Sequence, residues 1–229
     1  MTPEAALAAL RARSEPGRAL QMARYHKQTR PVLGVPNGLL DDLAKGWRHA
    51  LSLDDRVALA DGLWRTDIFE ARIAAAKLLT QARIRPDDAV WRLIASWVPQ
   101  FDGWAIADHA CMAGQRRVAA APDRLDEVER WTRAEHMWTR RAALVISLPW
   151  ARMTHPSADD LARRERILGW AEGYVPDRDR FIQKAVAWWL RDLSKRDPVR
   201  VEAFLAGPGV ELKTFARREA AKHLQRAKT

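Results

Sequence analysis

The stretch Phe181-Ile-Gln-Lys-Ala-Val-Ala-Trp-Trp-Leu190 begins with an aromatic residue, has a basic residue three positions later and continues with small and apolar residues. This composition favours a helix that packs closely against its neighbours. The same order of residue types recurs in the segments 69–78, 138–146 and 215–224. Recurrence of a helix-sized unit is typical of an α-solenoid built from antiparallel helix pairs of the HEAT or armadillo kind.

The rest of the chain is helical in its periodicity as well, and no run of alternating apolar and polar residues predicts a strand. Twelve prolines divide the chain into helix-sized pieces, so we expect an all-α fold. Three helix starts carry capping signals, which are Thr2 before Pro3, Ser52 with Asp55, and Asp197 before Pro198. The expected helices span residues 3–13, 17–28, 36–50, 53–65, 67–82, 86–98, 101–113, 122–134, 137–148, 157–172, 178–195, 198–206 and 213–227.

No linker rich in Pro, Gly and Ser interrupts the chain, which predicts a single HEAT-like domain over residues 1–229. The sequence has no apolar run of 18 residues and no signal-peptide pattern at its start, so we expect no membrane contact. The lone cysteine, Cys111, fits a small core residue in a reducing compartment. These features predict a cytoplasmic, nucleoid-associated protein.

The charge balance points to a polyanionic partner. Lys and Arg number 39 and Asp and Glu number 29, which gives a formal net charge of +10. In a stacked solenoid the basic residue of each repeat occupies an equivalent position, so these residues would line one concave face and follow phosphates. The last of them is Arg218. The alternative is that these residues are ordinary solvated or salt-bridged positions.

Motifs for common enzymes are missing from the sequence: it has no phosphate-binding loop, no HExxH, no G-x-S-x-G and no dinucleotide fingerprint. The six histidines are scattered, so we expect no metal and no cofactor. Trp104 and Asp108 are spaced i, i+4 and share a helix face, as do Trp188, Arg191 and Lys195. The alternative is that both tryptophans belong to the core and that Asp108 pairs with an arginine.

Several segments together resemble the AlkD-type alkylpurine DNA glycosylases. The resemblance runs in order from about residue 20 to 225. Its segments are Met22–Lys27 followed by Leu33-Gly-Val35, Trp138–Ala143, Phe181–Arg191 and Arg217–Leu224. It implies a HEAT-like solenoid whose concave face holds duplex DNA, and an activity that hydrolyses the N-glycosidic bond of cationic N3- and N7-alkylated purines without flipping the base.

The resemblance also implies roles for individual residues. Asp108, Trp104 and Trp188 match the family's catalytic set. The family's DNA-contacting positions match Tyr25, Arg141, Lys184, Arg191 and Lys195. Two residues depart from the family pattern: Ala105 follows the first tryptophan in place of an acidic residue, and Trp189 replaces a smaller apolar one. No lysine is placed as a Schiff-base nucleophile, so we expect a monofunctional, monomeric glycosylase acting on alkylated duplex DNA.

Three other functions stay open at this point. The chain could be a HEAT-like protein that binds DNA without catalysis. It could be a relative specialised for bulky alkyl adducts. It could also be a solenoid that binds proteins, although a net charge of +10 does not favour that function.

Overall fold

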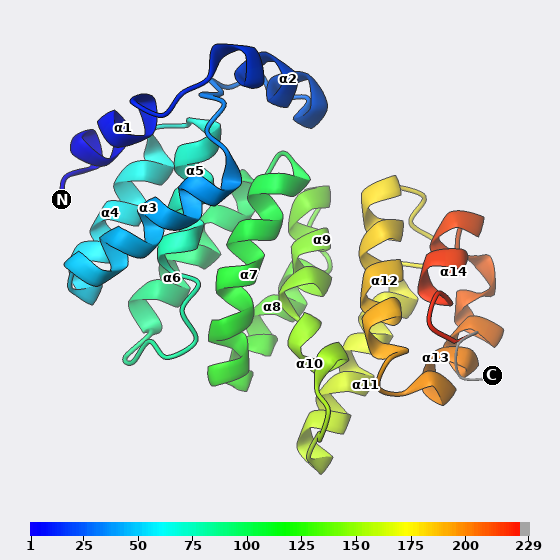
Figure 1. Ribbon diagram of the computed structural model, residues 1–229. Helices are drawn as coiled ribbons and strands as arrows, with labels where there is room; N and C mark the ends of the chain where they lie inside the picture. The colour runs from blue at the N-terminus through cyan, green and yellow to red at the C-terminus, as the bar shows by residue number, and fades with distance from the viewer. Residues whose placement is uncertain (225–229) are drawn as a thin grey trace. The chain divides into compact units, whose positions relative to one another are not determined.

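The computed structural model describes residues 1–224, and all the regular elements in this part of the chain are helices (Figure 1). The expected all-α fold is therefore confirmed. The first half contains α1 (Pro3–Arg11), α2 (Pro16–His26), α3 (Asn37–Ala50), α4 (Leu53–Arg65), α5 (Phe69–Leu78), α6 (Asp88–Trp97), η1 (Val98–Gln100) and α7 (Trp104–Ala120). The second half contains η2 (Pro122–Arg124), α8 (Leu125–Trp131), α9 (Met137–Ile146), α10 (Leu148–Arg152), α11 (Ala158–Gly173), α12 (Arg180–Leu193), α13 (Pro198–Ala206), η3 (Pro208–Glu211) and α14 (Thr214–Ala220).

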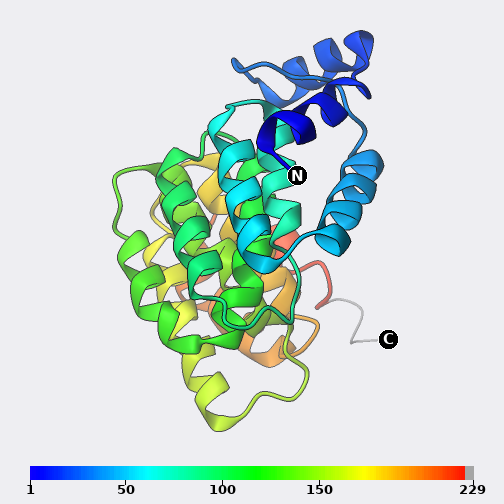
Figure 2. The same ribbon diagram turned by 90° about the vertical axis from the view of Figure 1, so that its left-hand side faces the viewer.

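The helices form two compact units, one over residues 1–120 and one from Ala121 onward. In the N-terminal unit α5 packs between α3 and α7. Helix α4 contacts α5, and α6 contacts α7 (Figure 2). In the C-terminal unit α12 packs against α9 and α14, and also contacts α10 and α13. Each unit therefore has the layered helix packing that the sequence repeat predicts.

The three helix starts marked by capping residues are all confirmed. The side chain of Thr2 accepts a hydrogen bond from the Ala5 N–H (3.2 Å). The side chains of Ser52 and Asp197 do the same for the third residue after them, Asp55 (3.2 Å) and Arg200 (3.0 Å). Each cap satisfies a backbone donor that the first helical turn leaves without a partner.

The aromatic-x-x-basic repeat has a physical meaning in two of its copies. The Arg141 guanidinium lies over the Trp138 ring and the Lys184 ammonium over the Phe181 ring, both 5.6 Å from the ring centroid. The rings of Trp138 and Phe181 also contact each other, with centroids 4.8 Å apart. The i, i+3 spacing thus produces cation–π pairs on adjacent helices.

Arg72 does not follow this pattern. Its guanidinium lies over Trp64 (4.8 Å) and pairs with Asp67 (2.9 Å), and the residue is buried. The expectation that the basic residue of every repeat lies on one exposed face is therefore wrong for Arg72, and also for Arg141, which is buried as well. The reason for Arg72 is that the Asp67 carboxylate, in the turn before α5, and the Trp64 indole, on α4, hold the side chain inside the unit.

The largest boundary difference is at α7, which continues to Ala120 instead of ending at residue 113. Arg117, in the additional turns, is fully buried and donates to the carbonyls of Gln81, Ala82 and Ile84. It also pairs with Asp87 (2.9 Å). These bonds fix the 81–87 loop to α7. They also stabilise the additional turns of α7, because Arg117 lies in those turns. In the last expected helix, 213–227, residues 225–227 lie outside the described part of the chain.

Much of the core is aromatic. Trp64 and Trp97 stack with centroids 4.2 Å apart and planes at 6°, and Trp150 and Trp189 are also fully buried. Cys111 is buried as expected. No helix in residues 1–224 is both long and apolar enough to cross a membrane.

Candidate functional site

Trp104 and Asp108 lie on one exposed stripe of α7. Along residues 104–118 the positions that are not buried are Trp104, Asp108, His109, Met112 and Arg116. Their spacing of about one turn is that of a single helix face. The expectation that Trp104 and Asp108 share a face is confirmed, and Trp104 is not a core residue.

The C-terminal end of α2 covers Trp104 with two rings. Tyr25 meets the indole edge-on, with centroids 6.0 Å apart, and His26 lies 4.9 Å from it. His26 also lies 4.9 Å from the ring of Phe69, so its imidazole is held between Phe69 and Trp104. Tyr25 itself is 72% exposed. The structure thus brings together Tyr25 and Trp104, two residues that the family resemblance singled out.

Most of α2 stands clear of the other helices of its unit, and no residue of it is buried (Figure 1). It is fixed through the segment that follows it. The backbone N–H groups of Leu33, Gly34 and Val35 donate to the carboxylate of Glu70, at 2.8, 2.6 and 3.2 Å. Glu70 is fully buried at the start of α5. A buried carboxylate with three amide donors is well compensated, and it holds this segment beside α5.

Arg30 ties the same segment to the start of α7. Its side chain pairs with Asp67 (3.1 Å) and with Asp102, two residues before Trp104.

Burial lowers the pKa of His26, and the charge of His109 adds to this effect. Burial also lowers the pKa of His109, whose Nδ1 lies 2.7 Å from the Ala105 carbonyl oxygen. The imidazoles of His26 and His109 are therefore neutral at physiological pH.

A groove of about 430 Å³ runs between α3, α5 and α7. His109 and Met112 of the α7 stripe line one side of it, and Lys77 and Arg48 line the other. Lys77 pairs with Asp41, and Arg48 donates to the Lys77 carbonyl oxygen (2.7 Å). The groove joins cationic side chains to the helix face that carries Asp108.

In the C-terminal unit, α12 has a stripe of its own. Among residues 181–195 the only ones that are not buried are Phe181, Lys184, Trp188, Arg191 and Lys195. The expectation that Trp188, Arg191 and Lys195 share a face is confirmed. Arg191 pairs with Glu219 of α14, whereas Lys184 and Lys195 are exposed.

Trp188 is surrounded by groups that the sequence analysis missed. Its Nε1 donates to Asp192 Oδ2 (3.1 Å), and the Arg152 guanidinium lies 5.8 Å from its ring centroid. Asp192 follows Trp188 at i+4, and that spacing is the signal that could have found it. Arg152 ends α10, a short helix that the sequence did not predict, so no local signal marks it.

The other expected residues fall into two groups. Arg218 is exposed on α14, but Arg141 is only 4% exposed, so it would need a side-chain shift to reach a ligand. Ala105 and Trp189, the two departures from the family pattern, are both buried. They therefore act on packing and do not line an exposed surface.

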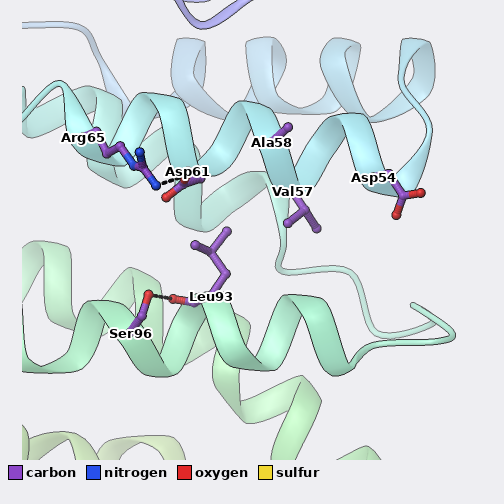
Figure 3. Close-up of a pocket in the computed structure, with 7 residues that line it drawn as sticks. All are labelled: Asp54, Val57, Ala58, Asp61, Arg65, Leu93 and Ser96. Atoms are coloured by element: carbon purple, nitrogen blue, oxygen red, sulfur yellow. Dashed lines mark hydrogen bonds and ion pairs between the residues drawn. The ribbon is translucent and has the colours of Figure 1, made fainter.

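Two further hollows are occupied by paired charges. The groove between α4 and α6, of about 460 Å³, contains the Asp61–Arg65 ion pair (2.7 Å; Figure 3). The hollow between α8, α9 and α11, of about 570 Å³, contains Arg166, which pairs with Glu129 (2.5 Å). Within residues 1–224 no cluster of His, Cys, Asp and Glu could hold a metal ion.

Comparison with known proteins agrees with this architecture. Residues 6–224 match the family described as DNA alkylation repair enzyme. No curated protein matches the chain significantly. A solved structure described as a predicted DNA alkylation repair enzyme from Enterococcus faecalis is 24% identical, with a TM-score of 0.75 over 93% of this chain and 97% of that one.

Two proteins from Streptococcus mutans have the same fold. AlkD2 is 15% identical, with a TM-score of 0.60 over 92% of this chain and 97% of that chain. The protein smu.31 is 18% identical, with a TM-score of 0.61 over 81% of this chain and 91% of that chain. At these identities the likeness establishes the fold.

Proposed function

Since the chain belongs to the DNA alkylation repair enzyme family, we propose that it is a monofunctional DNA glycosylase. Its substrate would be duplex DNA that contains cationic N3- or N7-alkylated purines, and it would hydrolyse their N-glycosidic bond. The observation that carries the proposal is the α7 stripe, where Asp108 lies one turn after Trp104 and Trp104 meets Tyr25.

The charge of the substrate explains why a carboxylate is needed. An N3- or N7-alkylated purine carries a positive charge and is already a good leaving group. As the glycosidic bond breaks, positive charge develops on the deoxyribose. Asp108 would stabilise that charge and could orient the attacking water. The α7 stripe leaves Asp108 partly exposed, so a sugar could approach it.

The two partly exposed tryptophans suit a cationic lesion. The face of an indole ring attracts cations, and the Arg152 guanidinium lies over Trp188 in this way. Trp104 and Trp188 would contact the sugar and the lesion through their rings. Because the charge and lability of the lesion select it, the enzyme would need neither a base-specific reader nor a pocket for a flipped base.

Exposed basic residues support binding to the DNA backbone. Lys184 and Lys195 lie on the α12 stripe and Arg218 on α14, and the net charge is +10. Arg191 and Arg141 complete the proposed set. Contacts of this kind neutralise phosphates without reading the sequence, so binding would be strongly dependent on salt.

The test is base release by the full-length protein from duplex DNA treated with a methylating agent, under single-turnover conditions. The assay separates 7-methylguanine from 3-methyladenine. We expect the wild type to release at least one of them. Asp108→Asn keeps the side-chain volume but removes the charge, and should slow release by about 10²–10³-fold.

Asp61→Asn is the matched control, because Asp61 pairs with Arg65 on α4, away from the α7 stripe. This variant should keep the wild-type rate. If the wild type binds DNA but releases no base from it, the protein is a DNA-binding relative without catalysis. Release of bulky adducts alone would identify a specialised enzyme instead.

A further inference from the structure

Asp192 is a buried carboxylate next to Trp188, Arg191 and Lys195 of the α12 stripe. It is 6% exposed and lies one turn after Trp188. Its Oδ2 accepts the hydrogen bond from Trp188 Nε1 at 3.1 Å. An indole has a single N–H donor, so a fixed acceptor defines the orientation of the ring.

The same carboxylate gathers three cations. Arg152 Nε donates to Oδ2 (2.8 Å), and Lys195 Nζ and Arg191 Nε lie 3.4 and 3.8 Å from Oδ1. Burial alone would raise the pKa of Asp192, but the hydrogen bond from Arg152 and the charges of the three cations outweigh it and lower the pKa. Asp192 is therefore charged in the folded protein at neutral pH.

Arg152 links both parts of this arrangement. Its Nε is bound to Asp192, while its guanidinium lies 5.8 Å from the centroid of the Trp188 ring. One carboxylate thus holds the edge of the indole and the cation over its face. Without it, the three cations around Trp188 would lose the carboxylate that they share, and the ring would lose the N–H acceptor that it has in the described structure.

From this geometry we propose that Asp192 is the positioning residue of Trp188. It holds the indole in the orientation that contacts the lesion, and it keeps the flanking basic side chains in place for the DNA backbone. The proposal rests on the proposed function, because it takes the role of Trp188 in base release as given.

The first experiment observes the indole directly and needs no activity. In ¹H–¹⁵N spectra of the full-length protein, the Trp188 indole signal is identified by its loss in Trp188→Phe. Asp192→Asn and Asp192→Ala should move this signal and speed exchange of its proton with water. The control Asp126→Asn removes an exposed carboxylate paired with Arg166 in the same unit, and it should leave the signal in place.

If neither Asp192 variant folds, the wild type still decides. A proton donated to a buried carboxylate exchanges slowly, whereas the proton of a partly exposed indole without an acceptor exchanges at the free rate. The proposal would be overturned if the Trp188 indole proton exchanged freely in the wild type. It would also be overturned if the Trp188 indole signal kept its position in both Asp192 variants.

The second experiment measures the consequence. Asp192→Ala should slow single-turnover base release by roughly tenfold, since it removes a hydrogen bond to a charged group. In a Trp188→Phe background, at protein concentrations that saturate the DNA, the same change should have little further effect on the rate of base release, because Phe has no N–H to position. Equal losses in both backgrounds would refute positioning through Trp188. If the wild type releases no base at all, the proposed function fails. The indole signal of Trp188 then still shows whether Asp192 positions this ring.

Discussion

The ring of Tyr25 lies edge-on to the indole of Trp104, with their planes at 85°, although the two residues are far apart in the sequence. Tyr25 is largely exposed, and its ring also contacts that of the neighbouring His26, with centroids 4.8 Å apart. A side chain that is 72% exposed can be changed with little effect on stability. Tyr25 is therefore a sensitive probe of the α7 stripe.

We expect Tyr25→Ala to slow base release by up to about tenfold, because an edge-to-face pair contributes about 0.5–1.5 kcal/mol. Tyr25→Phe retains the ring and should keep nearly the full rate. Single-turnover rates and melting temperatures check both variants. A Tyr25→Ala protein that melts well below the wild type would show that the ring is structural, contrary to this prediction.

The anchoring of α2 gives a second prediction. Gly34 has a φ of +81°, and a Cβ there would lie 2.3 Å from the Glu15 carbonyl oxygen and 2.6 Å from Ala19 N. Gly34→Ala should therefore displace α2 or break its anchor on Glu70. We expect a loss of about 1–3 kcal/mol in stability, together with slower base release.

Gly38→Ala is the matched control, because a Cβ at Gly38 would meet nothing within 4 Å. It should leave the rate unchanged and should not lower stability, because Ala is a better helix former than Gly. Protection of the α2 amides from hydrogen exchange, compared between the two variants, locates the effect. If α2 keeps its protection in Gly34→Ala, the close approach of the two backbones is not what fixes this helix.

The two stripes could be predicted from the sequence because they depend only on helix geometry. Residues spaced by three or four positions share a face wherever a helix forms, so Trp104 with Asp108 and Trp188 with Arg191 required no tertiary information. The capping residues were equally local. The family resemblance added Tyr25, whose contact with Trp104 no spacing rule could supply.

The buried charges could not be predicted, because their partners come from other segments. Glu70 binds amides of residues 33–35, and Arg117 binds carbonyls in the 81–84 loop. Arg72 shows what the repeat pattern does not predict. It occupies the basic position of its repeat, yet Asp67 and Trp64 hold its side chain inside the unit. A linear pattern gives the type of residue at a position, but only packing decides whether the residue faces water.

Phosphate contacts can be tested through their salt dependence. Lys184 is exposed and has no ion-pair partner within residues 1–224, so Lys184→Gln should reduce the slope of log K against log salt by about one unit. Arg65→Gln on the outer helix α4 should leave the slope unchanged. Binding to undamaged duplex DNA, measured by fluorescence anisotropy at several salt concentrations, makes the comparison. An equal slope for Lys184→Gln and the wild type would remove Lys184 from the DNA interface.

The last prediction concerns pH. Burial lowers the pKa of both His26 and His109 from their ordinary value of 6.5. The unfolded chain therefore binds more protons than the folded one as the pH falls below about 6.5, so these groups contribute stability above that pH and lose it as the pH falls toward their folded values. The melting temperature should decrease between about pH 7.5 and pH 5.5.

His26→Phe should flatten this decrease, because Phe retains a ring between Phe69 and Trp104 but cannot take up a proton. His49→Gln changes an exposed histidine on α3 and should keep the wild-type pH dependence. Thermal melting of the three proteins across this range gives the answer. The neutral ring of His26 is what α2 places against Trp104, so parallel curves for His26→Phe and the wild type would contradict the assignment of this pH dependence to His26.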